Sequence, residues 1–192
     1  MRSTGDEVRE RIISAARTEF AAHGIAGARI DRIATNAHAS KERLYAHFGD
    51  KLALFRFVLD ADSESFFAPI TANPEDLPGF VGTMFDRSQD HVEHLRMFGW
   101  ARMAGEPFRT THAIETVDRL RNVAEEAQRI GAVDTQWDPE EVVSLMFTLA
   151  FAWLQTPELR TGVYGRRHSS HERMIAVEAA RRLLEPRGRS GT

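Results

Sequence analysis

One short segment gathers side chains that can form hydrogen bonds and ion pairs: Lys41, Glu42, Arg43, Tyr45 and His47. Arginine can pair bidentately with guanine, and lysine, tyrosine and histidine can donate to phosphates or base edges. Glutamate can accept from cytosine or reject other bases. Lys51 begins the next predicted helix, where its charge and the exposed backbone N–H groups favour a phosphate. These residues form a candidate nucleic-acid contact.

Such side chains need a rigid support, and the surrounding apolar residues predict one. Ser40 is a favourable N-cap for a short helix whose inner face carries Leu44 and Phe48. A preceding helix over residues 30–38 has an apolar stripe that includes Ile33, Ala34 and Ala37. Two short helices separated by about three residues are typical of a helix-turn-helix, whose second helix enters a major groove. The alternative is a short basic helix that forms only a solvated surface.

The run from Ile33 to Lys51 resembles the DNA-binding signature of the tetracycline-repressor (TetR) family. That pattern has an Ile-Ala pair, a small residue, a turn, a serine, Leu-Tyr-x-x-Phe and a lysine three residues on. The resemblance covers residues 8–55, with further matches at Ala15, Ala16, Phe20 and Gly24. It implies an all-α regulator that binds double-stranded DNA through a helix-turn-helix, and most such proteins are repressors.

Two residues depart from the family pattern. His38 stands in the turn where the family usually has glycine, and Arg29 replaces the common Ser or Thr at the start of the second helix. Histidine tolerates a positive φ better than most residues, at some cost. The resemblance implies that bases are read by Lys41, Glu42 and Arg43. It assigns the DNA backbone to Arg29, Tyr45, His47 and Lys51, and Ser40 completes the predicted DNA-binding set.

Composition fits this interpretation. The chain has 192 residues, 42% hydrophobic and 28% charged, as in an ordinary soluble globular protein. Residues 1–51 carry nine Lys or Arg against seven Asp or Glu, whereas the remainder carries 16 against 21. A basic head on an acidic body suits a protein that touches DNA with one end.

The absence of cysteine excludes disulfides and thiolate metal sites, and it fits a reducing cytoplasm. The polar N-terminus lacks a secretory signal, and the apolar run over residues 142–154 is too short to span a bilayer. We therefore expect a cytoplasmic protein with no membrane contact.

Helical periodicity and capping signals predict about nine helices and no strand. Their expected ranges are 4–23, 30–38, 41–48, 51–70, 77–89, 92–104, 111–130, 138–155 and 169–185. The predicted domains are a helix-turn-helix DNA-binding domain over 1–50 and a helical effector-binding and dimerisation domain over 51–186. Residues 187–192 are expected to be a disordered tail.

The last two helices are expected to form a homodimer interface. Residues 142–154 are apolar over more than one face, so a partner subunit is the natural second cover in so small a chain. One head reads only a few base pairs, so useful specificity also requires a dimer on a palindromic site. The resemblance implies a four-helix bundle, and the interface residues expected are Leu145, Leu149, Trp153, Val177 and Leu184.

Many aromatic and methionine side chains in the body favour a small apolar or aromatic effector. In the family, such a ligand alters the spacing of the two heads and releases DNA, and we expect coupling through the fourth helix. The candidate effector residues are Phe66, Met84, Phe85, Trp100, Met103, Phe147 and Phe151. Ordinary core packing is the alternative, which leaves an effector-independent DNA-binding protein.

Two histidine pairs, His91 with His94 and His168 with His171, have a spacing that can bind a divalent metal. They make a metal-dependent enzyme the remaining alternative. Neither pair has an evident third ligand nearby in the sequence. No Gly-rich phosphate loop, nucleophile elbow or paired catalytic carboxylate stands out. We therefore expect no enzymatic activity, no metal and no cofactor.

Overall fold

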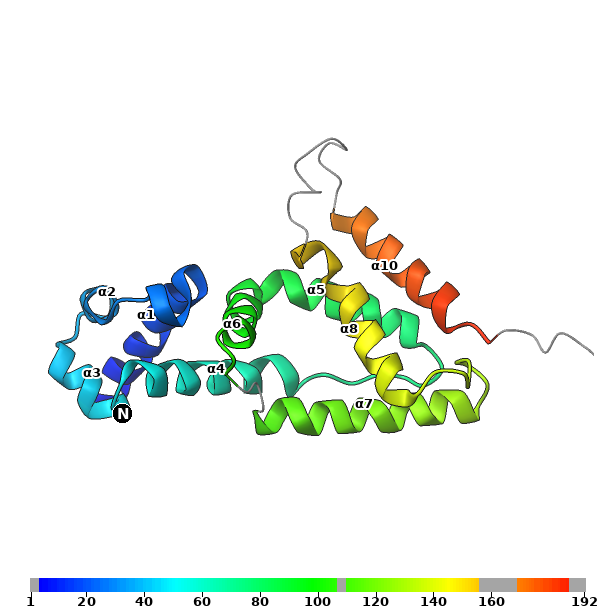
Figure 1. Ribbon diagram of the computed structural model, residues 1–192, viewed down its shortest axis with the longest axis horizontal. Coiled ribbons are helices and arrows are strands. Elements are labelled where there is room, and N and C mark those ends of the chain that lie inside the picture. The colour runs from blue at the N-terminus through cyan, green and yellow to red at the C-terminus, as the bar shows by residue number, and fades with distance from the viewer. Residues whose placement is uncertain (1–3, 107–109, 156–168, 187–192) are drawn as a thin grey trace, which may run out of the picture. The chain divides into compact units, whose positions relative to one another are not determined.

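The computed structural model describes residues 4–106, 110–155 and 169–186, and in these ranges it contains nine helices and no strand (Figure 1). The predicted all-α fold is confirmed. The helices are α1 (Thr4–Gly27), α2 (Ile30–Asn36), α3 (Lys41–Phe48), α4 (Lys51–Phe67), α5 (Leu77–Asp90), α6 (Val92–Met103), α7 (Thr111–Arg129), α8 (Pro139–Gln155) and α10 (Ser169–Leu184). The predicted tail over 187–192 lies outside the described residues.

The helices form two compact units that the chain visits alternately. The first unit comprises residues 1–69 and 91–113, and the second comprises residues 70–90 and 114–192. The first unit therefore extends past residue 50, because α1 packs against α4 and α6 as well as against α2.

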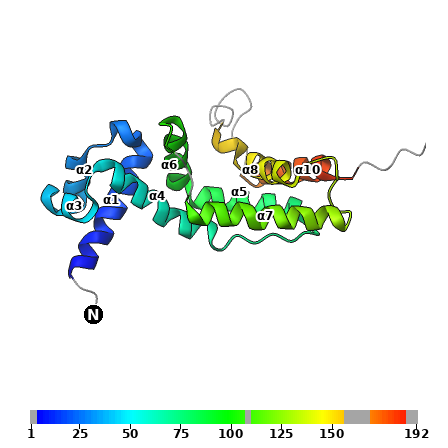
Figure 2. The same ribbon diagram turned by 60° about the horizontal axis from the view of Figure 1, so that its bottom comes forward.

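The helices α1, α2, α3, α4 and α6 of the first unit, labelled in Figure 2, all contribute side chains to one core. Side chains of α1 at helical spacing, Ile12, Ala16 and Phe20, are fully buried there. Phe20 meets Phe55 of α4 edge to face, with ring centroids 5.1 Å apart. Burying an isoleucine or phenylalanine side chain contributes about 1.5–3 kcal/mol, so this core holds α2 against α1, and α3 against α2 and α4.

Three helix ends differ from those that periodicity predicted. α1 continues past His23, but Gly24 has φ 64° and ψ −177° and interrupts the helical backbone. α2 ends at Asn36 rather than His38, because His38 takes a positive φ of 51°. α4 ends at Phe67, short of Ile70.

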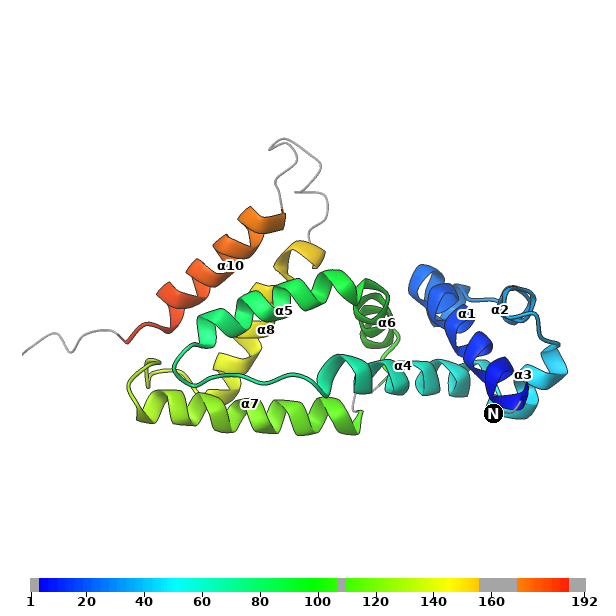
Figure 3. The same ribbon diagram turned by 180° about the vertical axis from the view of Figure 1, so that it is seen from behind.

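In the second unit, α5, α8 and α10 pack on one another (Figure 3). Hydrogen bonds from two polar side chains stabilise the connection between α7 and α8. The amide of Gln128 donates to the carbonyl of Trp137 at 2.7 Å, and the indole of Trp137 donates to the carbonyl of Leu183 at 3.3 Å. The first bond attaches the residues just before α8 to α7, and the second attaches them to the end of α10. Among the described helices, none combines the length and apolar character that a membrane crossing requires.

Candidate nucleic-acid interface

α3 presents a polar outer face on an apolar anchor. Leu44 and Phe48 are buried in the core of the first unit, which fixes the helix on its inner side. Ser40 caps the helix by accepting from the backbone N–H of Arg43 at 3.2 Å. Asp50 caps α4 in the same way, accepting from the N–H of Ala53 at 2.7 Å. The remaining side chains of the predicted reading helix are exposed: Lys41, Glu42, Arg43, Tyr45 and His47.

The turn between α2 and α3 is tight despite its missing glycine. His38 carries the positive φ there, and the N–H of Ala39 donates to the carbonyl of Ala34 at 3.0 Å. The side chain of Arg11 adds a clamp from α1, because its Nε donates to the carbonyl of Ala37 at 3.0 Å. Histidine pays a conformational cost in this region, and these contacts hold the turn in place.

Two of the three predicted base-reading side chains form an ion pair or hydrogen bonds with neighbouring groups of the protein. Lys41 forms an ion pair with Asp31 of α2, and this hydrogen-bonded carboxylate raises the pKa of Lys41. Hydrogen bonds from its own backbone amide and from the Ser40 hydroxyl lower the pKa of Glu42. The guanidinium of Arg43, by contrast, has no hydrogen bond or ion pair to any described residue. Arg43 is therefore the readily available bidentate donor on this face.

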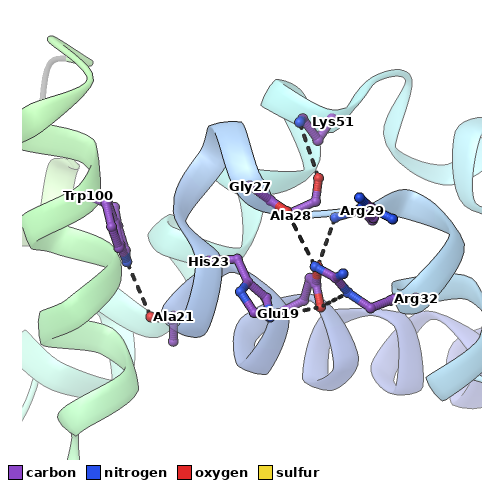
Figure 4. Close-up of polar contacts among 9 residues, drawn as sticks. All are labelled: Glu19, Ala21, His23, Gly27, Ala28, Arg29, Arg32, Lys51 and Trp100. Atoms are coloured by element: carbon purple, nitrogen blue, oxygen red, sulfur yellow. Dashed lines mark hydrogen bonds and ion pairs between the residues drawn. The ribbon is translucent and has the colours of Figure 1, made fainter.

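A buried carboxylate fixes the start of α2 (Figure 4). Glu19 of α1 accepts from the backbone N–H of Arg29 at 2.8 Å and from the guanidinium of Arg32 at 2.5–3.0 Å. His23 lies 3.9 Å from the same carboxylate. Burial acts to raise the pKa of Glu19, but the hydrogen bonds from Arg32 and Arg29 outweigh it, so the pKa lies below the ordinary value.

Arg29 is the N-cap residue of α2 and makes no side-chain cap, since it has no acceptor. The Glu19 carboxylate instead binds the N–H of Arg29, and the exposed Arg29 side chain extends outward from the helix start. Sequence patterns did not single out Glu19 or Arg32. Their 13-residue separation gives no periodic signal, and only the lack of a capping hydroxyl at position 29 hinted at a partner.

The ammonium group of Lys51 lies against the connection between α1 and α2 (Figure 4). It donates to the carbonyl of Ala28 at 3.2 Å and to that of Ala26 at 3.4 Å. The start of α4 is thereby attached to the residues that precede α2. This structural contact was not predicted, and it accompanies the half-buried position of Lys51.

The seven candidate effector residues fall into both units. Phe66, Trp100 and Met103 belong to the first unit. Trp100 and Met103 line an open depression between α1 and α6. Phe66 is buried and stacks on His94 with centroids 4.9 Å apart. The second unit holds the buried Met84 and Phe85 and the half-buried Phe147 and Phe151.

The predicted dimer residues differ in burial. Leu145, Leu149, Trp153 and Val177 are half-buried, whereas Leu184 is 2% exposed in the single chain. Met174, on α10, is 57% exposed and extends the accessible apolar area of that helix. Trp153 meets Phe85 edge to face at 6.0 Å.

The histidine pairs differ in their surroundings. His91 and His94 both lie against the ring of Phe66, and His94 is 2% exposed. His168 lies outside the described residues. Within the residues that are described, no three His, Asp or Glu side chains gather closely enough to hold a metal ion.

Comparison with known proteins assigns the two parts of the chain. Residues 12–58 match the family model described as "Bacterial regulatory proteins, tetR family". Residues 76–182 match the model described as "Tetracyclin repressor-like, C-terminal domain". The first match contains the helix-turn-helix described above.

Individual relatives agree with these matches. The HTH-type transcriptional repressor SCO4008 of Streptomyces coelicolor is 30% identical over 185 residues, covering 94% of this chain and 96% of that protein. The HTH-type transcriptional regulator RutR of Escherichia coli K12 is 30% identical over 105 residues, about half of each chain. The crystal structure of SCO4942 from Streptomyces coelicolor superposes with a TM-score of 0.82 at 35% identity, covering 92% of this chain and 98% of that one. The chain therefore belongs to the tetR family and is a DNA-binding transcriptional regulator.

Proposed function

We propose that this regulator binds a palindromic operator as a homodimer, represses transcription there, and is released by a small apolar or aromatic effector. The observation that carries the proposal is the exposed polar face of α3, held rigidly by the buried Leu44 and Phe48. A fixed helix with an unpaired arginine on its outer side is the arrangement needed for major-groove reading. The name of SCO4008 supports the repressor role.

The proposed DNA contacts divide by chemistry. Arg43 reads a base, Lys41 and Glu42 read neighbouring bases once their local partners are displaced, and Ser40 lies at the helix start beside them. Arg29, Tyr45, His47 and Lys51 contact the DNA backbone. Such phosphate contacts orient the protein and carry no sequence information directly.

Selection from a pool of random duplexes tests the operator. The full chain should enrich an inverted repeat, because two identical heads on one dimer read the same half-site in opposite orientations. Sedimentation of the complex should give two chains per duplex. Enrichment of no sequence, or of a single half-site bound by one chain, would contradict the proposal.

The dimer uses the half-buried apolar residues of α8 and α10, chiefly Leu145, Leu149, Trp153 and Val177. Leu184 is covered by its own chain, which leaves little of it for a partner. The proposed effector contacts in the second unit are Phe147 and Phe151, whose rings lie 5.7 Å apart and are not fully buried. A thermal-shift screen of small aromatic compounds tests this site, and Phe151→Ala should abolish any shift that the unmodified protein shows.

Asp31→Asn should tighten DNA binding. The change removes a negative charge beside the proposed interface and frees Lys41 for a phosphate or base. We expect affinity for any duplex to rise by about two- to five-fold at low salt, with a smaller gain at high salt. Asp60→Asn, at an exposed carboxylate further along α4, removes the same charge and should leave affinity unchanged. Equal effects of both variants would show that only net charge matters.

Lys51→Ala should weaken binding to all sequences by about three- to ten-fold and lower the salt slope by about one. Lys51→Gln keeps a hydrogen-bond donor for the carbonyls of Ala26 and Ala28 but removes the charge. It should therefore lower the slope equally while retaining more thermal stability. An unchanged salt slope in both variants would show that the amine serves only the backbone carbonyls.

A further inference from the structure

Trp100 of α6 contacts α1 close to the break in that helix at Gly24 (Figure 4). Its indole N–H donates to the carbonyl of Ala21 at 3.2 Å. Ala21 lies in the last turn before Gly24, whose φ and ψ interrupt the helical backbone. The indole therefore attaches α6 to the turn of α1 that precedes the break.

The ring of Trp100 also explains why residue 24 is glycine. A Cβ built at Gly24 would lie 2.8 Å from Cδ2 and 2.9 Å from Cε3 of Trp100, inside van der Waals contact. The φ of 64° at Gly24 independently favours glycine. The aromatic ring thus covers the backbone of the break directly, in the place that a side chain would fill.

The same turn of α1 carries the carboxylate that fixes α2. Glu19 lies two residues before Ala21 and binds the backbone N–H of Arg29 and the guanidinium of Arg32. Between the break and α2, Lys51 binds the carbonyls of Ala26 and Ala28. Three polar groups, an indole, a carboxylate and an ammonium, thus hold a short connection whose geometry sets the start of the helix-turn-helix.

We propose that Trp100 is a positioning residue for DNA binding: its indole holds the end of α1 so that Glu19 presents α2, and through it α3, at the angle that DNA requires. This inference rests on the proposed operator binding. Trp100 itself does not contact DNA, and it contributes by reducing the freedom of the connection before binding.

The chain offers a matched control. Trp137 also donates its indole N–H to a helix-end carbonyl, that of Leu183 at 3.3 Å, but in the second unit. Trp100→Phe and Trp137→Phe therefore remove the same kind of bond and keep an aromatic ring. Both should lower the melting temperature slightly. Trp100→Phe should weaken binding to the duplex selected by the unmodified protein by about three- to ten-fold, whereas Trp137→Phe should stay within about two-fold.

The indole N–H resonances provide a second measurement in the unmodified protein. Trp137→Phe and Trp153→Phe each remove one signal, which leaves that of Trp100 assigned even if Trp100→Phe does not fold. Because the proposed hydrogen bond to Ala21 exists before DNA binds, the Trp100 indole N–H should already be protected from exchange with solvent in the DNA-free protein. Wild-type affinity of Trp100→Phe, equal losses of affinity in the two variants, or a Trp100 indole N–H that exchanges freely with solvent would each overturn the proposal. Failure of the unmodified protein to select any duplex would instead contradict the proposed function.

Discussion

Replacing Arg43 by alanine is expected to weaken binding to the selected operator by about 1–3 kcal/mol, or about 5- to 150-fold. The guanidinium is exposed on α3 and has no partner among the described residues, so it is available to a guanine without breaking another contact. Its loss should relax the base preference at one position of each half-site. Fluorescence anisotropy with the selected duplex and with its single-base variants measures both effects.

Arg43→Lys separates base reading from charge. Lysine keeps the positive charge for the phosphates but loses the planar pair of donors. We expect Arg43→Lys to retain affinity for random DNA and to lose most of the base preference. If both Arg43→Ala and Arg43→Lys kept the base preference of the unmodified protein, α3 would read DNA through other residues or another helix would enter the groove.

The local features of the helix-turn-helix could be predicted because neighbouring residues determine them. Ser40 as cap, Leu44 and Phe48 as inner face, and a positive φ at His38 all depend on contacts within a few residues. Helix ends were less accurate. α1 was expected to end at His23, but it resumes after a break at Gly24 and ends at Gly27, and the ring that covers this break belongs to Trp100, far away in the sequence.

The polar contacts that position these helices could not be predicted in this way. The charge of Lys51 and its place at a helix start predict a phosphate contact, but no sequence pattern predicted that its ammonium group also binds two backbone carbonyls. Such pairings join residues 10 to 79 positions apart, across which helical periodicity carries no information. The candidate effector residues show the same limit, since composition selected seven large side chains that fold into two separate units.

Glu19→Ala is expected to lower the free energy of unfolding at pH 7 by about 2–4 kcal/mol. The change leaves the part-buried N–H of Arg29 without its acceptor and removes the bidentate partner of Arg32. Arg32 is partly exposed and regains water, which limits the loss. Urea unfolding at a fixed protein concentration measures it, because a dimer's stability depends on concentration.

The pH dependence of this loss identifies its cause. A carboxyl whose pKa is lower in the folded than in the unfolded chain stabilises the fold above its unfolded pKa, and this contribution disappears as the pH falls through the folded pKa. The pKa of Glu19 lies below the ordinary 4.5. The difference in free energy of unfolding between the unmodified chain and Glu19→Ala should therefore be complete at pH 7 and should decrease below about pH 4.5.

Glu178→Ala is the matched control, since Glu178 also accepts from two arginines but on an exposed helix surface. Solvent screening weakens such a pair, so its removal should change stability far less. If the loss of stability in Glu19→Ala stays the same at acidic pH, the side chain acts through packing. If the loss becomes smaller as the pH falls, the ionised carboxylate fixes the start of α2.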